Sequence, residues 1–420
     1  MKNTNADANA DAAAEQKIFF EEDYSLAPFF TFQDSKAKAF YNWFYYKEAF
    51  APEFVEYALR RFAAKPNARV LDPFCGVGTT LLAAKELGFA SAGVDASPLC
   101  VLASRVKTRD YDDVLKESVA AAFKKICKAK FEFPKEEWRF ELFGPRRALP
   151  RGSYDEALHL RKQLRETEPK EAREFLALAL ASALPEASLV IKDGGVLKIR
   201  KNKRHLPSLR QAFERRAKRM LKDLSNPVKG PNPEVLIGDA RQLAFDDESF
   251  DAVITSPPYL NGVDYSKIYG LELSLLFGEN AALDYRRSAL RSFIERDARN
   301  ARESEDATIA ERCLRASQSE LAEGVPDIAL AYLTDMTRVF RETKRVLRGG
   351  ESGGKAAFVV GNAVLPGAYV AVDEVLALIA LELDFGKAKI VVGSERVADV
   401  STERGAERRR VRESAVMLEK

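Results

Sequence analysis

The chain has 420 residues, of which 46% are hydrophobic, so it can bury the core of one large domain or of two ordinary ones. Its formal net charge of +3 is only mildly basic and neither requires nor excludes a nucleic-acid partner. Four cysteines without a CxxC pair and only two histidines argue against a zinc site and a disulfide framework, and no apolar run is long enough for a membrane span, so we expect a protein of the reducing cytoplasm.

The beginning of the chain divides into a polar tail and an aromatic segment. Residues 1–20 open with a tract rich in Asn, Asp and Ala that has no signal-peptide pattern, and we expect this tail to be disordered. From residue 21 to residue 62 aromatic side chains are dense, which favours packing in a core. The end of this segment predicts a helix that starts near Phe50.

The first strong motif is Val70-Leu71-Asp72-Pro73-Phe74-Cys75-Gly76-Val77-Gly78-Thr79-Thr80, a short strand followed by a glycine turn and a helix start. Gly76 and Gly78 permit backbone conformations and close approaches that a Cβ would forbid, and the helix start offers unpaired N–H groups. No Gly-Lys-Ser/Thr follows, so the turn is not a phosphate-binding P-loop, and the third glycine of the dinucleotide fingerprint is absent.

A second strand, Ser91–Asp95, ends in an acid. Asp95 follows Gly78 at about the spacing at which an acid after the second strand of a βαβ unit binds ribose hydroxyls. The alternative is an aspartate that caps a turn or a helix. Its place at the carboxyl end of a parallel strand favours the binding role.

Residues 111–232 interrupt the α/β alternation and are mostly helical in pattern. The amphipathic segments are Val114–Lys130, Lys170–Leu184 and Arg210–Leu224. Between the last two, a Gly-Gly turn precedes a basic stretch with five candidate nucleic-acid contacts: Lys198, Arg200, Lys201, Lys203 and Arg204. Such a stretch is either a solvated charged face or a surface that contacts phosphates, and we favour the second interpretation.

The stretch Thr255-Ser256-Pro257-Pro258-Tyr259 follows an apolar run that predicts a short buried strand. The prolines end that strand because they cannot donate ladder hydrogen bonds. Pro258 has no N–H, so the loop can offer the Ser256 hydroxyl and the Pro257 carbonyl as acceptors to an external amino group. Tyr259 offers a flat face on which a nucleobase can stack. A plain strand end with a proline turn is the alternative.

The remainder predicts further α/β elements. Asn261, Asp264 and Tyr265 either line a pocket or cap a helix over Lys267–Phe277. Residues 281–324 form a highly charged helical excursion, which is either a flap over the substrate or a solvated surface. The last expected elements are a helix over Ile328–Leu347, a strand over Ala356–Asn362, a helix over Val370–Leu383 and strands over Lys389–Gly393 and Glu413–Leu418, with Arg408–Arg412 in the closing hairpin.

Together, the Asp-Pro-Phe-Cys-Gly-Val-Gly-Thr-Thr turn and the Ser-Pro-Pro-Tyr tetrad resemble the motifs of the S-adenosylmethionine-dependent DNA amino-methyltransferases, the N4/N6 DNA methylase family. A serine at the first tetrad position is the form most associated with the cytosine-N4 enzymes, whereas Asp or Asn is commoner in adenine-N6 and RNA guanine-N2 relatives. No cysteine follows a proline, so the Pro-Cys nucleophile of the cytosine-C5 enzymes is missing. The resemblance covers about residues 50–106 and 233–420.

The resemblance implies S-adenosylmethionine as cofactor and methylation of the N4 amino group of cytosine in double-stranded DNA, with the target base flipped out. It implies a site-specific enzyme of the restriction-modification type, for which a cognate restriction endonuclease is a candidate partner. The implied cofactor-binding residues are Asp72, Phe74, Gly76, Gly78, Thr79, Asp95 and Asp239, and the implied catalytic residues are Ser256, Pro257, Pro258 and Tyr259. A metal is not implied.

Two alternatives to this function stay open. One is a methyltransferase for adenine N6 in DNA or for guanine N2 or adenine N6 in RNA, although the segment before the core is too short for a separate RNA-binding domain. The other is a catalytically idle nucleic-acid-binding module with the same fold.

The expected fold is the α/β fold of the class I methyltransferases, a Rossmann-like, mostly parallel sheet with an inserted helical region. Residues 21–110 would form the aromatic segment and the cofactor half, and residues 233–420 the catalytic half. Residues 111–232 are the leading candidate for target recognition. Their place between the second and third cofactor strands, rather than just before the tetrad, makes the 281–324 excursion the reserve candidate.

Overall fold

The centre of the protein is an eight-stranded sheet with the order β1-β12-β13-β9-β7-β2-β3-β6. The computed structural model describes residues 18–140, 144–193, 196–201, 205–260, 262–293, 304–321, 324–350, 353–402 and 405–420. The strands of this sheet are β1 (Phe19–Glu22), β2 (Arg69–Asp72), β3 (Ala90–Asp95), β6 (Glu234–Ile237), β7 (Ala252–Thr255), β9 (Lys355–Gly361), β12 (Lys387–Thr402) and β13 (Gly405–Glu419).

All neighbouring strands of the large sheet are parallel except β13, which runs antiparallel to both β9 and β12. The parallel order reverses after β2, which lies between β3 and β7, so a crevice opens at the carboxyl ends of β2 and β7. This order, with the antiparallel β13 inserted between the parallel strands β9 and β12, confirms the predicted class I methyltransferase fold.

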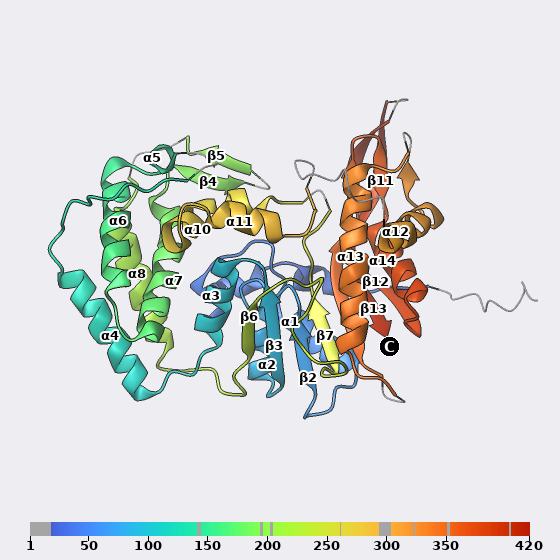
Figure 1. Ribbon diagram of the computed structural model, residues 1–420, viewed down its shortest axis with the longest axis horizontal. Helices are drawn as coiled ribbons and strands as arrows, with labels where there is room; N and C mark the ends of the chain where they lie inside the picture. The colour runs from blue at the N-terminus through green and yellow to red at the C-terminus, as the bar shows by residue number, and fades with distance from the viewer. Residues whose placement is uncertain are drawn as a thin grey trace, which may run out of the picture.

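The sheet is covered on both faces, as its continuous apolar strands require. Consecutive residues of β7 point to opposite faces, where Ile254 packs with Phe54 and Val253 packs with Phe340. The covering helices include α1 (Pro52–Arg61), α2 (Thr79–Glu86), α3 (Pro98–Thr108), α13 (Asp327–Val346) and α14 (Val372–Glu382). In Figure 1 this α/β body fills the centre and the right-hand side.

The segment 111–232 folds into a helical body at the left of Figure 1, beyond the β6 edge of the sheet. Its elements are α4 (Asp113–Lys128), α5 (Pro145–Ala148), α6 (Arg151–Arg165), α7 (Lys170–Ala187), β4 (Val190–Asp193), β5 (Val196–Ile199) and α8 (Leu209–Asp223). Its core includes the fully buried Phe175 and Phe213 and is continuous with Trp43 from the aromatic segment. The predicted helical interruption is therefore present, and part of the aromatic segment packs against it.

Lys85 of α2 joins the two ends of this helical body. Its side chain is buried, and its Nζ donates to the Thr108 carbonyl at 2.7 Å, to Asp110 Oδ1 at 2.6 Å and to Asn232 Oδ1 at 2.6 Å. Asp110 and Asn232 are the residues where the chain leaves and rejoins the α/β body. One buried ammonium thus holds the base of the helical body closed.

The remaining elements are short. They are the 3₁₀ helices η1 (Tyr24–Phe30), η2 (Asp34–Ala37) and η3 (Tyr41–Trp43), the helices α9 (Tyr265–Ile268), α10 (Gly270–Phe277), α11 (Ala281–Ser288) and α12 (Glu305–Ala316), and the strands β8 (Glu320–Leu321), β10 (Ala363–Leu365) and β11 (Ala368–Val370). Strands β10, β11 and β8 form a separate small sheet. None of the helices in the described part of the chain is long and apolar enough to span a membrane.

Three expectations for local structure need correction. Phe19 and Phe20, assigned to the tail, begin β1 and pair in parallel with β12, whereas residues 1–17 lie outside the described residues. The helix expected over 267–277 is split into α9 and α10 at Tyr269. The closing hairpin is much longer than expected, because β12 and β13 continue pairing beyond the ends of their neighbours. Such continuation depends on contacts between distant segments, which local patterning does not encode.

Candidate active site

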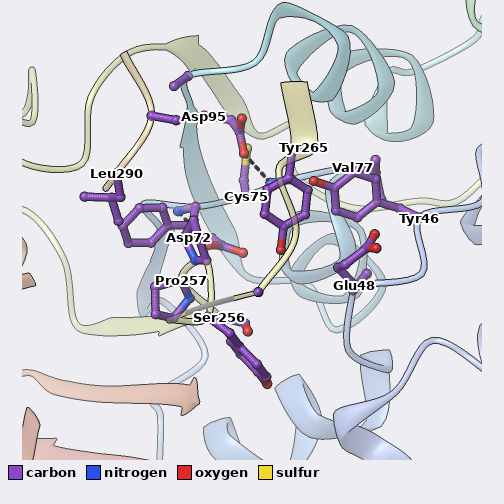
Figure 2. A pocket seen from close by; sticks show the side chains of 18 of the residues that line it. Tyr46, Glu48, Asp72, Cys75, Val77, Asp95, Ser256, Pro257, Tyr265 and Leu290 are labelled. Atoms are coloured by element: carbon purple, nitrogen blue, oxygen red, sulfur yellow. Dashed lines mark hydrogen bonds between the residues drawn. The ribbon is translucent and has the colours of Figure 1, made fainter. Parts of the chain in front are cut away.

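The loops that follow β2 and β7 lie side by side and line one cavity of about 290 Å³. Asp72, the last residue of β2, and Thr255, the last residue of β7, are both buried. The Thr255 hydroxyl donates to Asp72 Oδ1 at 2.6 Å, and the Phe74 N–H donates to the same oxygen at 3.1 Å. Asp72 therefore ties the glycine turn to the proline loop, and Figure 2 shows its carboxylate between Asp95 and Ser256. Burial raises the pKa of Asp72 to about 6, although the hydrogen bond from Thr255 lowers it.

Ser256 has a defined hydrogen-bonding role in the proline loop. Its hydroxyl donates to the Val359 carbonyl of β9 at 3.0 Å. Because that bond uses the only hydroxyl proton, the oxygen keeps its lone pairs for a donor in the cavity. No hydrogen bond to the Pro257 carbonyl is present within the described residues, and Pro258 has no N–H. The Ser256 oxygen and the Pro257 carbonyl therefore remain available as acceptors, and their role toward an amino group stays a prediction.

Tyr259 lines the same cavity and is held at its ring and at its hydroxyl. The hydroxyl donates to Glu413 Oε1 of β13 at 2.9 Å. The ring lies so close to Gly361 that a Cβ there would be 3.0 Å from the ring carbon Cε2. Burial raises the pKa of both Tyr259 and Glu413, so the tyrosine stays a neutral donor. The aromatic ring is therefore fixed in orientation at the cavity wall.

The glycine turn contributes Gly76 to the cavity and uses Gly78 elsewhere. Gly76 adopts a left-handed conformation (φ +49°), and its N–H donates to Asp95 Oδ2 at 2.9 Å. Gly78, also left-handed (φ +83°), does not line the cavity, and a Cβ there would be 2.9 Å from Ser104 Oγ. Direct cofactor contact by Gly78 stays a prediction, whereas its position shows that the turn packs closely against α3.

Thr79 and Asp95 complete the turn side of the cavity. Thr79 opens α2, and its Oγ1 is buried without a hydrogen-bond partner among the described residues, although Thr79 lines the cavity. Asp95 accepts from the N–H groups of Gly76 and Ser97, the latter at 2.8 Å. Burial raises the pKa of Asp95 to about 6.

Asp239 lies where the cavity opens into an adjoining groove. Both of its carboxylate oxygens accept from Arg241, the shorter contact being 2.7 Å. The groove is flanked by two partly exposed apolar side chains, Ile237 at 59% and Phe277 at 39% exposure. A slot with apolar walls and a carboxylate at its rim suits a flat heterocycle that carries an amino group.

Several cavity residues were not singled out by the sequence. Tyr46 and Glu48 come from the aromatic segment, and Tyr285 and Leu290 come from α11 and the residues after it. Figure 2 shows Tyr46, Glu48 and Tyr265 on one side of the cavity and Leu290 on the other. Tyr46 stacks on Tyr265 with ring centroids 6.0 Å apart. The density of aromatics before residue 62 was a signal for these contacts, but it pointed equally well to a core.

The residues after Tyr259 were predicted either to line a pocket or to cap a helix, and the structure gives a different answer for each. Tyr265 lines the cavity. Asp264 caps α9, because its carboxylate accepts from the N–H groups of Ser266 and Lys267. Asn261 lies outside the described residues. Within the 281–324 excursion, α11 covers part of the cavity, while α12 packs against α13 and α14 away from it.

The cavity fits S-adenosylmethionine, which carries a sulfonium, an ammonium and a carboxylate. Asp72 and Asp95 have no Lys or Arg ion-pair partner in the described part of the chain, and burial raises the pKa of both carboxyl groups, so a cationic group beside them would be favourable. The unpartnered Thr79 hydroxyl at the start of α2 offers a donor for an anionic group. Six of the predicted cofactor-binding residues line this space, and their contacts with the cofactor stay a prediction: Asp72, Phe74, Gly76, Thr79, Asp95 and Asp239.

The predicted nucleic-acid contacts lie on and after the β4–β5 hairpin. Lys198 is exposed and pairs with Asp193 of the same hairpin at 2.8 Å. Arg200 donates to the Ser188 and Pro185 carbonyls at the end of α7, both at 2.9 Å, so in this structure it serves that helix end. Lys201 is exposed, whereas Lys203 and Arg204 lie outside the described residues. Their assignment to a nucleic-acid surface stays a prediction.

No group of three His, Cys, Asp or Glu side chains suited to a metal ion occurs among the residues with described positions. A family model described as DNA methylase matches residues 10–103. The type II methyltransferase M.BsoBI of Geobacillus stearothermophilus is 28% identical over 89% of this chain and 84% of that protein.

Two further curated proteins are similar. The type II methyltransferase M.AvaI of Nostoc sp. is 26% identical over 86% of this chain and 82% of its own length. The type II methyltransferase M.MjaII of Methanocaldococcus jannaschii is 37% identical over a shorter stretch, 23% of this chain and 18% of its own length. The first two relatives match along most of the chain, including both sequence motifs and the helical body between them.

Proposed function

Since the chain belongs to the N4/N6 family of DNA methylases, whose cofactor is S-adenosylmethionine, we propose that it methylates the exocyclic N4 amino group of cytosine at a specific site in DNA. The curated relatives are type II methyltransferases, which supports site specificity. The serine at the start of the tetrad supports cytosine N4. The observation that carries the proposal is the bond from the Ser256 hydroxyl to the Val359 carbonyl, because it makes Ser256 an acceptor toward the cavity.

An exocyclic amine is a poor nucleophile because its lone pair is delocalised into the base. In our proposal the Ser256 oxygen and the Pro257 carbonyl accept its two hydrogens and favour a more tetrahedral nitrogen with an available lone pair. The Thr255–Asp72 bond holds this loop against the glycine turn, so orientation supplies much of the rate. When bound, S-adenosylmethionine supplies an electrophilic methyl group on its sulfonium sulfur.

The other cavity residues have binding and orienting roles in this proposal. Tyr259 stacks on the flipped base, with its ring plane fixed by Glu413 and Gly361. Asp95 accepts hydroxyl groups of the cofactor ribose, and Thr79 donates to the cofactor carboxylate. Asp239 lies at the rim of the apolar slot for the adenine. The surplus proton of the methylated nitrogen leaves to water.

The test is methylation of unmethylated DNA by the purified protein with labelled S-adenosylmethionine, followed by nucleoside mass spectrometry of DNA and of RNA incubated in parallel. We expect N4-methylcytosine in DNA. Detection of N6-methyladenine would indicate adenine as the target base, since the same two acceptors fit its amino group. Label found in RNA alone would indicate that the substrate is RNA and not DNA. Cofactor binding without transfer to any polymer would indicate an idle binding module.

The site assignment is tested with Ser256→Ala and Tyr259→Ala. We expect Ser256→Ala to lower kcat by at least tenfold with little change in cofactor affinity, because it removes one of two acceptors. Ser394→Ala is the control, since the Ser394 hydroxyl donates to Glu413 Oε2 at 3.4 Å but Ser394 is not among the residues that line the cavity. Full activity in the Ser256→Ala/Tyr259→Ala double variant would disprove the assignment.

A further inference from the structure

The long closing hairpin leaves the sheet next to the candidate active site. Beyond Val392, β12 has no partner other than β13, because its pairing with β1 ends there. In the described chain, the ladder between β13 and β9 ends at the pair Glu413–Gly361, and one further hydrogen bond runs from the Asn362 N–H to the Arg412 carbonyl at 2.9 Å. Eight residue pairs, from Glu395–Arg412 to Thr402–Gly405, then form a two-stranded ribbon about 26 Å long that extends beyond the large sheet.

The direction of this ribbon follows from the topology. β12 is parallel to β9 and β7, since β13 is antiparallel to both β9 and β12. The ribbon therefore projects past the carboxyl edge of the sheet, the edge at which the cavity opens, and it rises at the upper right of Figure 1. Its first residue on the β13 side is next to Glu413, which lines the cavity and holds the Tyr259 hydroxyl.

The base of the ribbon is firmly anchored. Arg412 donates to Asp373 Oδ2 at 2.9 Å and to Glu374 Oε1 at 2.6 Å. Val411 is 2% exposed and packs with Tyr369 of the small sheet. These contacts fix the base of the ribbon next to Glu413, at the wall of the cavity.

The side chains above the anchor are exposed and suited to nucleic acid. The Arg410 side chain is 79% exposed, and its cross-strand partner Val397 is 63% exposed. Arg396 and Arg408 are also exposed. Two acids pair with arginines of this ribbon in the described part of the chain: Glu395 lies 3.3 Å from Arg410, and Glu320 of β8 lies 2.7 Å from Arg409. Guanidinium groups on a rigid ribbon are suited to phosphate contacts, which position a duplex.

We propose that this ribbon, with Arg396, Val397, Arg408 and Arg410, is a DNA-contacting arm that enters a groove of the duplex beside the flipped base. This inference rests on the proposed function, because a duplex that delivers a base to Tyr259 must lie across the carboxyl edge, where the ribbon occupies its path. The major groove, about 12 Å wide, admits a two-stranded ribbon. In Figure 1 the ribbon rises at the upper right and the β4–β5 hairpin lies at the upper left, and in this proposal the duplex lies between them.

The experiment compares Arg396→Ala/Arg410→Ala with a control of equal charge change, Arg60→Ala/Lys387→Ala. Arg60 and Lys387 are exposed, at 77% and 68%, and lie at the end of α1 and the start of β12, on the opposite edge of the sheet. Equilibrium binding to duplex DNA at several salt concentrations, KM for DNA and cofactor affinity are measured for both. For the arm variant we expect the salt slope of log K to fall by about 1 to 2, as expected for one or two lost phosphate contacts, and KM for DNA to rise about tenfold. Cofactor affinity should stay unchanged.

If the two double variants have the same salt slope and the same KM for DNA, the ribbon is not a DNA-contacting arm. If the wild-type protein methylates no DNA, the proposed function is refuted instead. As an independent measurement, a photoreactive probe is attached in a Val397→Cys/Cys127→Ser protein, since Cys127 is the partly exposed native cysteine of the described chain. We expect cross-links to duplex DNA. Cross-links to a protein partner alone, or none in the presence of bound DNA, would also overturn the proposal.

Discussion

Replacing Thr255 with valine tests the link between the two halves of the site. The change is nearly isosteric at a fully buried position and removes one group, the hydroxyl that donates to Asp72 Oδ1 at 2.6 Å. Removing one partner of a buried hydrogen bond costs about 1–3 kcal/mol, because the remaining group stays buried without compensation. Here the remaining group is a carboxylate, so the cost depends on its ionisation.

The pH dependence follows from the sign of the pKa change. Burial already raises the pKa of Asp72 from 3.8 to about 6, so between about pH 4 and pH 6 the unfolded chain loses its proton before the folded chain does. Ionisation of this group therefore lowers the free energy of unfolding across that window, by about 3 kcal/mol above pH 6. Without the Thr255 hydroxyl, the same 1–3 kcal/mol moves the pKa up by about one to two pH units, and the window extends to about pH 7–8.

The assay is urea unfolding of wild-type and Thr255→Val protein from pH 5 to pH 8, with Thr343→Val as control. Thr343 is equally buried, but its hydroxyl has no hydrogen-bond partner among the described residues. We expect the destabilisation of Thr255→Val to grow with pH, and Thr343→Val to be neutral or slightly stabilising at every pH. A Thr255→Val protein no less stable than the control, or a destabilisation independent of pH, would refute this account of Asp72.

Three further predictions follow from the same geometry. Since the pKa of Asp95 is about 6 and its ionised form is the better acceptor, the calorimetric dissociation constant for S-adenosylmethionine should rise as the pH falls below about 6, and a flat profile in the wild type would contradict this role. Gly78→Ala should lower stability by about 1–3 kcal/mol in chemical unfolding, through its left-handed φ and the contact with Ser104, and Ser104→Gly should relieve part of that loss. Lys85→Met should cost about 2–4 kcal/mol, because it leaves the Thr108 carbonyl and Asp110 without their shared donor, whereas an unchanged unfolding midpoint would show that the base of the helical body does not need it.

The local chemistry of the site could be predicted from the sequence. Asp72 to Thr80 and Thr255 to Tyr259 are contiguous stretches in which residue type dictates backbone form: glycines allow the turn, prolines end the strand, and apolar runs specify buried strands. The alternation of these runs with amphipathic helices indicated a parallel α/β sheet. The helical interruption at 111–232 was evident for the same reason, since periodicity is a local property.

Tertiary structure decided which distant side chains complete and support these motifs. Glu413 accepts a hydrogen bond from Tyr259 although the two residues are 154 positions apart. A side chain at Gly78 would clash with Ser104 of α3, so this position requires glycine. Arg200 differs from the other basic residues of its stretch because it donates to the backbone carbonyls at the end of α7. The closing hairpin extends beyond the large sheet because the neighbouring strands β1 and β9 end earlier. These outcomes depend on which segments come into contact when the chain packs, and the spacing of residues along the chain carries no record of those contacts.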